Sequence, residues 1–287
     1  MGADVLIHSQ QMAADRSGLL MDLPRERAGW PWMSLIVRRL RQGDRWEAGS
    51  AEEEHALVLL GGYCSVDIGS GRRHIGERAD VFQGLPYAVY LPGGRTAVFD
   101  AQTTCEIAEC CVPSQARLEP RIVTPDDVRV TLRGGGSASR QIVDVMPPDF
   151  PADRVMAVEV YTPSGNWSSY PPHKHEVHNP PAEVDLDEIY YYRISKPEGY
   201  AHQRLYSSDG TRDCVVTARD GDAVLIHDGY HPVVAAHGYD VYYLNFLAGS
   251  ARSLANTVDP THAWVMESWN GYSSGLPIVP MSRTSKV

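Results

Sequence analysis

Residues 173–193 read HKHEVHNPPAEVDLDEIYYYR, a polar stretch with three histidines and a row of carboxylates that turns into an aromatic run. The aromatic and β-branched side chains from Glu188 onward are typical of a β-strand. Alternate residues of a strand point to the same face, so the imidazoles of His173 and His175 can converge on one ion. The spacing alone leaves two interpretations open, a metal site on strands or a solvated polar loop.

Short runs rich in Val, Ile, Tyr and Leu recur on both sides of this stretch. The 287 residues include 25 glycines and 20 prolines, which is typical of many short strands joined by turns. The segments with strand character are 55–62, 63–69, 87–94, 104–112, 154–163, 188–195, 203–208, 213–236 and 239–249. Two β-rich halves of similar rhythm predict an all-β protein, a duplicated sandwich or barrel with its junction near residues 115 to 140.

Charge and composition argue against several classes of protein. A formal net charge of −10 without a basic run is unlike a nucleic-acid-binding protein and favours a small-molecule substrate. No run of about 18 apolar residues predicts a membrane span, and the first residues lack the apolar core of a signal peptide. Five cysteines without a CxxC spacing suit reduced thiols. We therefore expect a cytoplasmic protein that binds neither nucleic acid nor membrane.

A second motif, GDAVLIHDGYHP at residues 221–232, places a short apolar strand, a turn at Gly229 and then His231. With Glu188 at the start of a neighbouring strand, three imidazoles and one carboxylate would suit Zn²⁺, Mn²⁺, Fe²⁺ or Ni²⁺ and leave positions open for water or substrate. Glu188 is preferred because it alone joins a predicted strand directly. The nearby residues that could replace a ligand are His178, Glu176, Glu183, Asp185 and Asp187.

The two motifs resemble those of the cupins, with the spacings G-x7-HxH-x12-E from Gly165 and G-x5-H-x-G-x-H from Gly221. The segments PPHKHE, EIYYYRI, QRLY and GDAVLIHDGYHPV resemble the 5-deoxy-glucuronate isomerase family of inositol catabolism. The resemblance extends to the first half through IGERADVFQGLPYAVYLPGG (75–94) and RGGGSASRQIVDV (133–145), so it covers nearly all of the chain.

The resemblance implies two cupin domains, an N-terminal cupin-like domain over residues 1–126 that lacks metal ligands and a C-terminal metal-binding cupin over residues 127–287. It implies one divalent transition metal per chain, Zn, Mn, Fe or Ni. Carried over residue by residue, the ligands are His173, His175, Glu188 and His231.

One residue departs from the cupin pattern, which usually has proline where this chain has His227. Parity places His227 near His231, so an exchange of ligand stays open, although a structural or surface role is favoured. The first half has no HxH, and we expect His55 and His74 to be ordinary strand and turn histidines.

The implied reaction is an aldose–ketose isomerisation of 5-deoxy-D-glucuronate to 5-dehydro-2-deoxy-D-gluconate. A divalent ion can polarise the carbonyl and the neighbouring hydroxyl. Either a base then moves a proton between adjacent carbons, or a hydride shift needs no base. The catalytic candidates are Glu188, His178 and Glu183, with Glu176, His202 and hydroxide on the ion as further possibilities.

The substrate carboxylate requires a cation, and Arg204 is the best candidate. Lys174 and Arg193 are rivals, but strand alternation points both away from the metal. The residues that could bind sugar hydroxyls are Gln203, Tyr206 and Tyr243. A packing role is the alternative for each of them. The aromatic runs YYYR and DVYYLN also suggest a homo-oligomer, because two-sided aromatic strands need cover on both faces.

Three other functions remain open. A 5-keto-4-deoxyuronate isomerase of the pectin pathway shares the ligand pattern, although EIYYYR and GLPYAVYLPGG favour the inositol-pathway family. A cupin dioxygenase would use the same ligands for Fe²⁺ and would consume oxygen. A non-catalytic sugar-acid-binding cupin is disfavoured as a sensor, because the chain shows no helix-turn-helix pattern or basic appendage.

Overall fold

The structure is a computed structural model that describes residues 5–9 and 18–283. Contacts divide the chain into two compact units. Of the described residues, the C-terminal unit takes 5–8, 130–143 and 158–278, and the N-terminal unit takes 9, 18–129, 144–157 and 279–283. The units interleave along the chain, whereas the sequence analysis expects a single boundary between residues 126 and 127. Part of the cause is strand pairing, because Leu6 and Ile7 pair with Val224 and Ala223 of the C-terminal unit.

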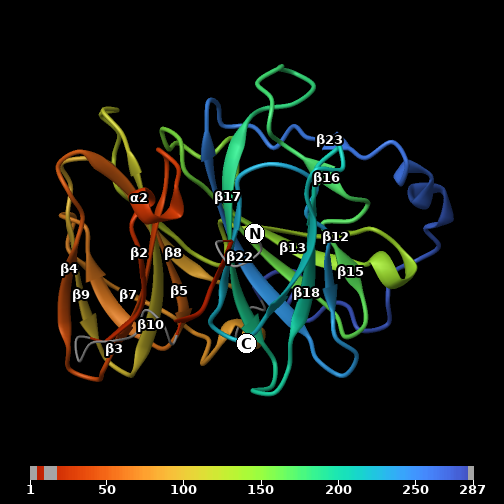
Figure 1. Ribbon diagram of the computed structural model, residues 1–287. Coiled ribbons are helices and arrows are strands. Elements are labelled where there is room, and N and C mark those ends of the chain that lie inside the picture. Colours follow the sequence, from red (N-terminus) through yellow and green to blue (C-terminus); the bar gives the residue numbers. More distant parts are fainter. Residues whose placement is uncertain (1–4, 10–17, 284–287) are drawn as a thin grey trace. The chain divides into compact units, whose positions relative to one another are not determined.

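The C-terminal unit is built from short strands in three sheets (Figure 1). Its strands are β1 (Leu6–Ile7), β12 (Arg129–Arg133), β13 (Arg140–Met146), β14 (Met156–Thr162), β15 (Trp167–Ser168), β16 (His173–Lys174), β17 (Leu186–Ile194), β18 (Ala201–Tyr206), β19 (Asp213–Ala218), β20 (Ala223–Ile226), β21 (Val233–Ala235), β22 (Val241–Gly249) and β23 (Thr257–Val258). Of these, β12, β13 and β14 each have one end among the residues of the N-terminal unit. The sheet orders are β1-β20-β17-β22-β14-β13-β12, β15-β21-β18-β19 and β16-β23. Side chains of the two larger sheets, such as Tyr192 and Leu205, share one apolar core.

The N-terminal unit has two sheets. Its strands are β2 (Leu19–Leu23), β3 (Ser34–Leu40), β4 (Arg45–Ala48), β5 (Glu53–Gly61), β6 (Cys64–Asp67), β7 (Arg72–Ile75), β8 (Tyr87–Leu91), β9 (Ala97–Ala101), β10 (Cys105–Pro113) and β11 (Arg121–Val123). The sheet orders are β11-β8-β5-β10-β3-β2 and β4-β9-β6-β7. Leu57 and Ile107 of the first sheet pack with Phe99 of the second in a separate apolar core.

The all-β class expected from the sequence is confirmed. Apart from Ser9, helical structure in the described residues is confined to α2 (Arg25–Ala28) and the 3-10 turns η1 (Val81–Gln83), η2 (Gly136–Ala138) and η3 (Ala263–Ser268). None of the helices in the described part of the chain is long and apolar enough to cross a membrane. The central strands also repeat one arrangement, since β17 lies between β20 and β22 as β5 lies between β8 and β10.

Candidate active site

Separate segments of the C-terminal unit bring the predicted ligand residues together. His173 lies in β16, and Glu188 lies near the start of β17. His175 is held beside β17 because the backbone N–H of Leu186 donates to its carbonyl oxygen at 3.0 Å. The polar stretch of the sequence therefore leaves one short strand, crosses a loop and returns along the next strand to the same place.

His231 is positioned by the turn that precedes it. Gly229 has a φ of +76°, and a Cβ added there would lie 2.6 Å from the carbonyl oxygen of Tyr206. Only glycine fits this conformation and this close approach without strain. The Gly229 carbonyl then accepts a hydrogen bond from Nδ1 of His231 at 2.9 Å, which fixes the direction of the ring.

The four side chains meet around one point. Nε2 of His175 lies 2.9 Å from Oε2 of Glu188, and Nε2 of His231 lies 3.4 Å from the same oxygen. One ligand atom from each of these three residues falls within 4.8 Å of the others. The ring of His173 is 4.9 Å from that of His231, centroid to centroid.

This donor set fits a divalent transition metal. Nδ1 of His175 donates to the Leu186 carbonyl at 2.9 Å, as Nδ1 of His231 does to Gly229, so in the neutral form of each ring Nε2 carries the lone pair that can bind a metal. The buried Nε2 of His231 has no hydrogen-bond partner among the described residues. Atoms about 2.1 Å from one ion lie about 3.0 to 3.4 Å apart, close to the separations seen here. A cation would satisfy lone pairs that the protein leaves facing one another.

The charge state of the site favours binding of a cation. Burial alone would raise the pKa of Glu188, but its contacts with His175 and His231 lower that pKa below its usual range, so the carboxylate is ionised. Burial, followed by the neighbouring imidazoles, lowers the pKa of His173, which keeps that ring neutral. Asn245 Nδ2 donates to the other carboxylate oxygen of Glu188 and fixes its orientation.

A cavity of about 270 Å³ is lined by His173, His175 and Glu188. Its walls combine the apolar side chains of Ile142, Val158 and Leu247 with a few polar groups. The polar or charged residues on its lining are Arg133, Arg140, Ser169, Tyr170, His173, His175, Glu188, Tyr190, Tyr243, Asn245, Asn256 and Trp269. An apolar pocket with few convergent polar groups is the usual form of a small-molecule site.

Arg140, at the start of β13, is the cation best placed for an acidic substrate. It is half-buried, and its Nη1 donates to the carbonyl oxygen of Tyr170 at 2.8 Å. No carboxylate of residues 5–9 or 18–283 forms an ion pair with it. Burial lowers the pKa of this guanidinium from its very high ordinary value, and arginine stays charged in proteins. The cavity is thus lined by a positive charge that has no ion-pair partner among the described residues.

Three hydroxyl groups form a short hydrogen-bonded chain on the cavity wall. Ser169 Oγ lies 2.9 Å from the hydroxyl of Tyr190 and 3.3 Å from that of Tyr243. Ser169 has a φ of +48°, which is uncommon for a residue with a side chain and costs about 1 kcal/mol or more. Burial raises the pKa of both tyrosines, so their hydroxyls stay protonated at neutral pH. The strained serine holds its hydroxyl between the hydroxyl groups of two tyrosines.

Known relatives align with this chain over most of its length. The model of the KduI/IolB family matches residues 5–265. The chain belongs to the KduI/IolB family. The 5-deoxy-glucuronate isomerase of Geobacillus thermodenitrificans is 40% identical to this family member over 256 residues, 88% of this chain and 93% of the relative. That of Bacillus subtilis strain 168 is 35% identical over 239 residues, 82% and 88% of the two chains.

Solved structures give the same result for the fold. The crystal structure of an IolB-like protein from Salmonella typhimurium superposes on this KduI/IolB member with a TM-score of 0.87, at 35% identity, over 92% of this chain and 99% of the other. A mutant form of the oxalate decarboxylase of Bacillus subtilis matches with a TM-score of 0.62 at 14% identity, over 88% and 79% of the two chains. The more distant match shows the fold alone, and the cupin architecture expected from the sequence is confirmed.

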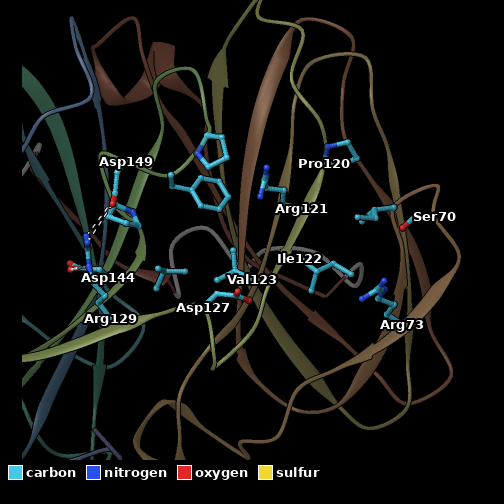
Figure 2. Close-up of a pocket in the computed structure, with 15 residues that line it drawn as sticks. Ser70, Arg73, Pro120, Arg121, Ile122, Val123, Asp127, Arg129, Asp144 and Asp149 are labelled. Carbon is cyan, nitrogen blue, oxygen red and sulfur yellow. Dashed lines mark hydrogen bonds and ion pairs between the residues drawn. The ribbon is translucent and has the colours of Figure 1, made fainter. Parts of the chain in front are cut away.

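A larger cavity, of about 580 Å³, lies in the N-terminal unit of this KduI/IolB member (Figure 2). Its charged lining is partly paired internally, since Arg129 lies 3.5 Å from Asp144 and 3.4 Å from Asp149. No histidine or cysteine of the described residues lines it. Size therefore does not identify the reactive site here, and the smaller cavity holds the groups that can do chemistry.

Several residues singled out in the sequence have other partners in the structure and lie outside the smaller cavity. Arg204 is bound by Asp213 through two hydrogen bonds of 2.8 and 2.7 Å. Arg193 pairs with Asp220 at 2.9 Å. These two arginines therefore have their own counter-charges, which leaves Arg140 as the better-placed cation.

Lys174 lies outside the cavity as well, and so do the base candidates Glu176, His178 and Glu183. Lys174 pairs with Glu176 at 2.7 Å and with Glu183 at 3.1 Å. His178 is largely exposed and contacts Asp185 at 3.0 Å. The side chains of this loop bind one another and one edge of the unit, away from the substrate space.

Gln203 and Tyr206 lie outside the cavity lining and form hydrogen bonds with other residues of the unit. Gln203 accepts a hydrogen bond from Tyr192 at 2.9 Å and donates to the His231 carbonyl at 3.3 Å. Tyr206 donates to Asp259 at 2.6 Å. Of the residues expected to bind substrate, Tyr243 is the one that lines the cavity, while His202 and His227 are outside its lining.

Arg140, Ser169, Tyr190 and Asn245 are site residues that the sequence analysis does not single out. Tyr190 follows Glu188 by two positions, so strand parity was a signal that could have identified it. Arg140 lies in RGGGSASRQIVDV, a segment that carries the family resemblance. Pattern within one segment gives no indication that these residues from four segments meet.

Glu183 has a structural role that predicts a pH-dependent stability. Burial would raise its pKa, but hydrogen bonds from Thr257, the backbone of Glu176, Lys174 and the backbone of Val177 lower it below the usual range. Its contribution is therefore full above the ordinary glutamate pKa and is lost as the pH falls through the lowered value. We expect Glu183→Gln to lower Tm by several degrees at pH 7 and by less near pH 3, measured by calorimetry. An equal loss of Tm at both pH values would contradict this role.

Proposed function

We propose that the protein is a metal-dependent 5-deoxy-glucuronate isomerase that forms 5-dehydro-2-deoxy-D-gluconate from 5-deoxy-D-glucuronate. The observation that carries the proposal is the convergence of His175, the Glu188 carboxylate and the unpartnered Nε2 of His231 beside a cavity lined by Arg140, which has no ion-pair partner among the described residues. Relatives at 34 to 40% identity bear the name of this isomerase. The proposed substrate is a small sugar acid, which fits a cavity lined by two arginines, Arg133 and Arg140, and several hydroxyl groups.

The chain would hold one divalent ion through His173, His175, Glu188 and His231. Such an ion supplies polarisation of the substrate carbonyl and of the adjacent hydroxyl oxygen. Arg140 would bind the carboxylate at the far end of the substrate through charge-assisted hydrogen bonds. Asn245 keeps the Glu188 carboxylate oriented, so the acidic ligand stays in place while substrate enters.

The reaction moves one hydrogen between adjacent carbons and one proton between their oxygens. Glu188 is the single carboxylate among the described residues on the cavity lining, and it is assigned to the ion. A hydride shift from C2 to C1, which requires no base, therefore fits the cavity better than proton abstraction by a side chain. The hydroxyls of Tyr190, Ser169 and Tyr243 would then carry the proton from the C2 hydroxyl to the oxygen on C1.

Ser169→Ala is expected to lower kcat about tenfold with little change in KM, because it breaks the hydroxyl chain but leaves Arg140 and the metal ligands in place. Steady-state kinetics with matched metal loading measures the effect. Ser207→Ala is the control, since Ser207 lies outside the cavity lining and its hydroxyl donates to Asp209 at 2.5 Å. Unchanged kcat in the Ser169 variant would remove the serine from the proton path.

The hydride shift also predicts an isotope result. Turnover in D₂O should give a product with no deuterium at C1, because the transferred hydrogen never exchanges with solvent. Nuclear magnetic resonance of the product taken at early conversion measures this. Full deuterium incorporation at C1 would instead require a base, and Glu188 would be the first residue to test.

The proposal as a whole is tested by elemental analysis of the purified protein together with conversion of 5-deoxy-glucuronate before and after chelation. Loss of conversion on chelation and its return with added metal would support it. Full activity of a metal-free protein would refute the metal dependence. Oxygen uptake without isomerisation would point to a dioxygenase, and activity on 5-keto-4-deoxyuronate alone to the pectin-pathway reaction.

We infer that the protein works in the cytoplasm, where its five free cysteines would stay reduced. The ion would be Zn²⁺, Mn²⁺, Fe²⁺ or Ni²⁺, since imidazole and carboxylate ligands accept each of them. A homo-oligomer is part of the proposal and can be tested by light scattering.

A further inference from the structure

A second cluster of potential metal ligands lies in the N-terminal unit. Glu53 and His55 come from β5, and Glu109 and Cys111 come from the adjacent β10. His55, Glu109 and Cys111 are each only 4% exposed, and Glu53 is half-buried. All four have the parity of Leu57 and Ile107, so they lie on the face of the sheet that packs into the core of this unit.

The cluster occupies the place in its sheet that Glu188 occupies in the other unit. Glu188 pairs with Ile226 of β20 and Leu247 of β22, while His55 pairs with Leu91 of β8 and Cys111 of β10. In both units this residue is third in a nine-residue central strand.

The neighbouring positions agree with this alignment. The same register places Asn245 of β22 in correspondence with Glu109 of β10. Each forms a hydrogen bond with the third residue of the central strand: Asn245 with Glu188, and Glu109 with His55. The N-terminal unit therefore has a polar, ligand-bearing cluster where the C-terminal unit has its candidate metal centre.

The distances in the cluster suit coordination of one ion. Nδ1 of His55 lies 2.7 Å from Oε1 of Glu109 and 3.3 Å from Sγ of Cys111. Sulfur and nitrogen ligands of one tetrahedral zinc ion lie about 3.5 Å apart. Ligand atoms from Glu53, His55 and Cys111 all fall within 4.8 Å of one another.

The surroundings supply an orienting contact and an excess of negative charge. Nε2 of His55 lies 3.0 Å from the hydroxyl of Ser50, which can accept its proton and leave Nδ1 free as a ligand. The cluster contains two carboxylates, Glu53 and Glu109. Arg25, which pairs with Glu53 at 2.6 Å, supplies one positive charge against them. A divalent ion would balance the remaining charge and would stabilise the Cys111 thiolate.

We propose that the N-terminal unit contains a second metal site, formed by Glu53, His55 and Cys111 with Glu109 beside His55, that prefers Zn²⁺ or Co²⁺. The thiolate sets this preference, because sulfur ligands select zinc over the harder ions that carboxylates and waters favour. The sequence analysis expects no metal ligands in this half, since it contains no HxH. The proposed site draws its ligands from two strands, so no single motif indicates it.

The test uses the sulfur ligand, which the centre at His175 lacks. The metal-free full-length protein is titrated with Co²⁺, and the near-ultraviolet thiolate-to-cobalt charge-transfer band is recorded together with the bound metal. We expect about two equivalents of Co²⁺ to bind per chain. The charge-transfer band should reach its full intensity with about one bound equivalent, because only one of the two sites has a thiolate ligand. Cys111→Ser should lose the band and one equivalent. His175→Ala should keep the band.

Cys110→Ser is the matched control. Cys110 is the adjacent buried thiol, it has the opposite strand parity, and its loss should leave the band intact. His55→Gln gives a second variant in case Cys111→Ser does not fold. A single bound equivalent without a thiolate band in the folded wild-type protein would overturn the proposal and leave His55 and Glu109 as a buried hydrogen-bonded pair. A band that survives in a folded Cys111→Ser variant would also overturn it.

Discussion

His175→Ala is expected to remove the ion from the C-terminal unit and to lower isomerase turnover about a thousandfold or more, with the fold intact. The expected loss is large because the proposed ion would contribute several kcal/mol of transition-state stabilisation. The fold should persist because the apolar core of the unit, with residues such as Tyr192 and Val224, does not include His175. Elemental analysis, steady-state kinetics and thermal unfolding measure the three expected results.

His178→Ala is the matched control for this variant. His178 is three residues further along, is largely exposed and contacts Asp185, outside the cavity. It should retain both metal and turnover. Full metal content and activity in His175→Ala would contradict the proposed ligand set.

Arg140→Gln is expected to lower kcat/KM for 5-deoxy-glucuronate about 10- to 150-fold. The range follows from the loss of charge-assisted hydrogen bonds to the substrate carboxylate, worth about 1.5 to 3 kcal/mol. KM should carry most of the change if the carboxylate is bound equally in the ground and transition states. Kinetics at constant metal loading distinguishes this from an indirect effect on the ion.

Arg204→Gln provides the comparison, because Arg204 lies outside the cavity and is paired with Asp213. We expect its kinetics to match the wild-type protein. Arg140→Gln with an unchanged KM and kcat, or a large defect in Arg204→Gln, would assign the substrate carboxylate to a different cation.

The close approach of the proposed metal ligands could be expected from the sequence because much of their geometry is encoded locally. Alternate positions share a strand face, which relates His173 to His175, and the aromatic run marks the strand that holds Glu188. The position of His231 could be predicted because a glycine turn fixes it relative to the preceding strand. In each case a short stretch of chain determines where the side chain points.

The substrate groups could not be predicted in the same way. Arg140 reaches the cavity from β13, and its place there depends on how separate strands pair. Arg204 looks suitable in the sequence, but the strand β19 next to it supplies Asp213 as a partner. Glu183 looks like a solvated loop residue, yet it is buried and accepts hydrogen bonds from the backbone. These outcomes depend on tertiary pairing, to which local patterns are blind.

The interleaving of the two units limits how the protein can be dissected. A fragment that begins at residue 127 would keep the four proposed ligands but would lose β1, which covers the edge of β20 through Leu6 and Val224. It would also carry residues 144–157, whose contacts belong to the N-terminal unit. An exposed strand edge invites pairing with other chains. The unit that holds the proposed metal centre is therefore formed from separate segments of the sequence. Transferring this unit to another protein would require transfer of the strand β1 as well.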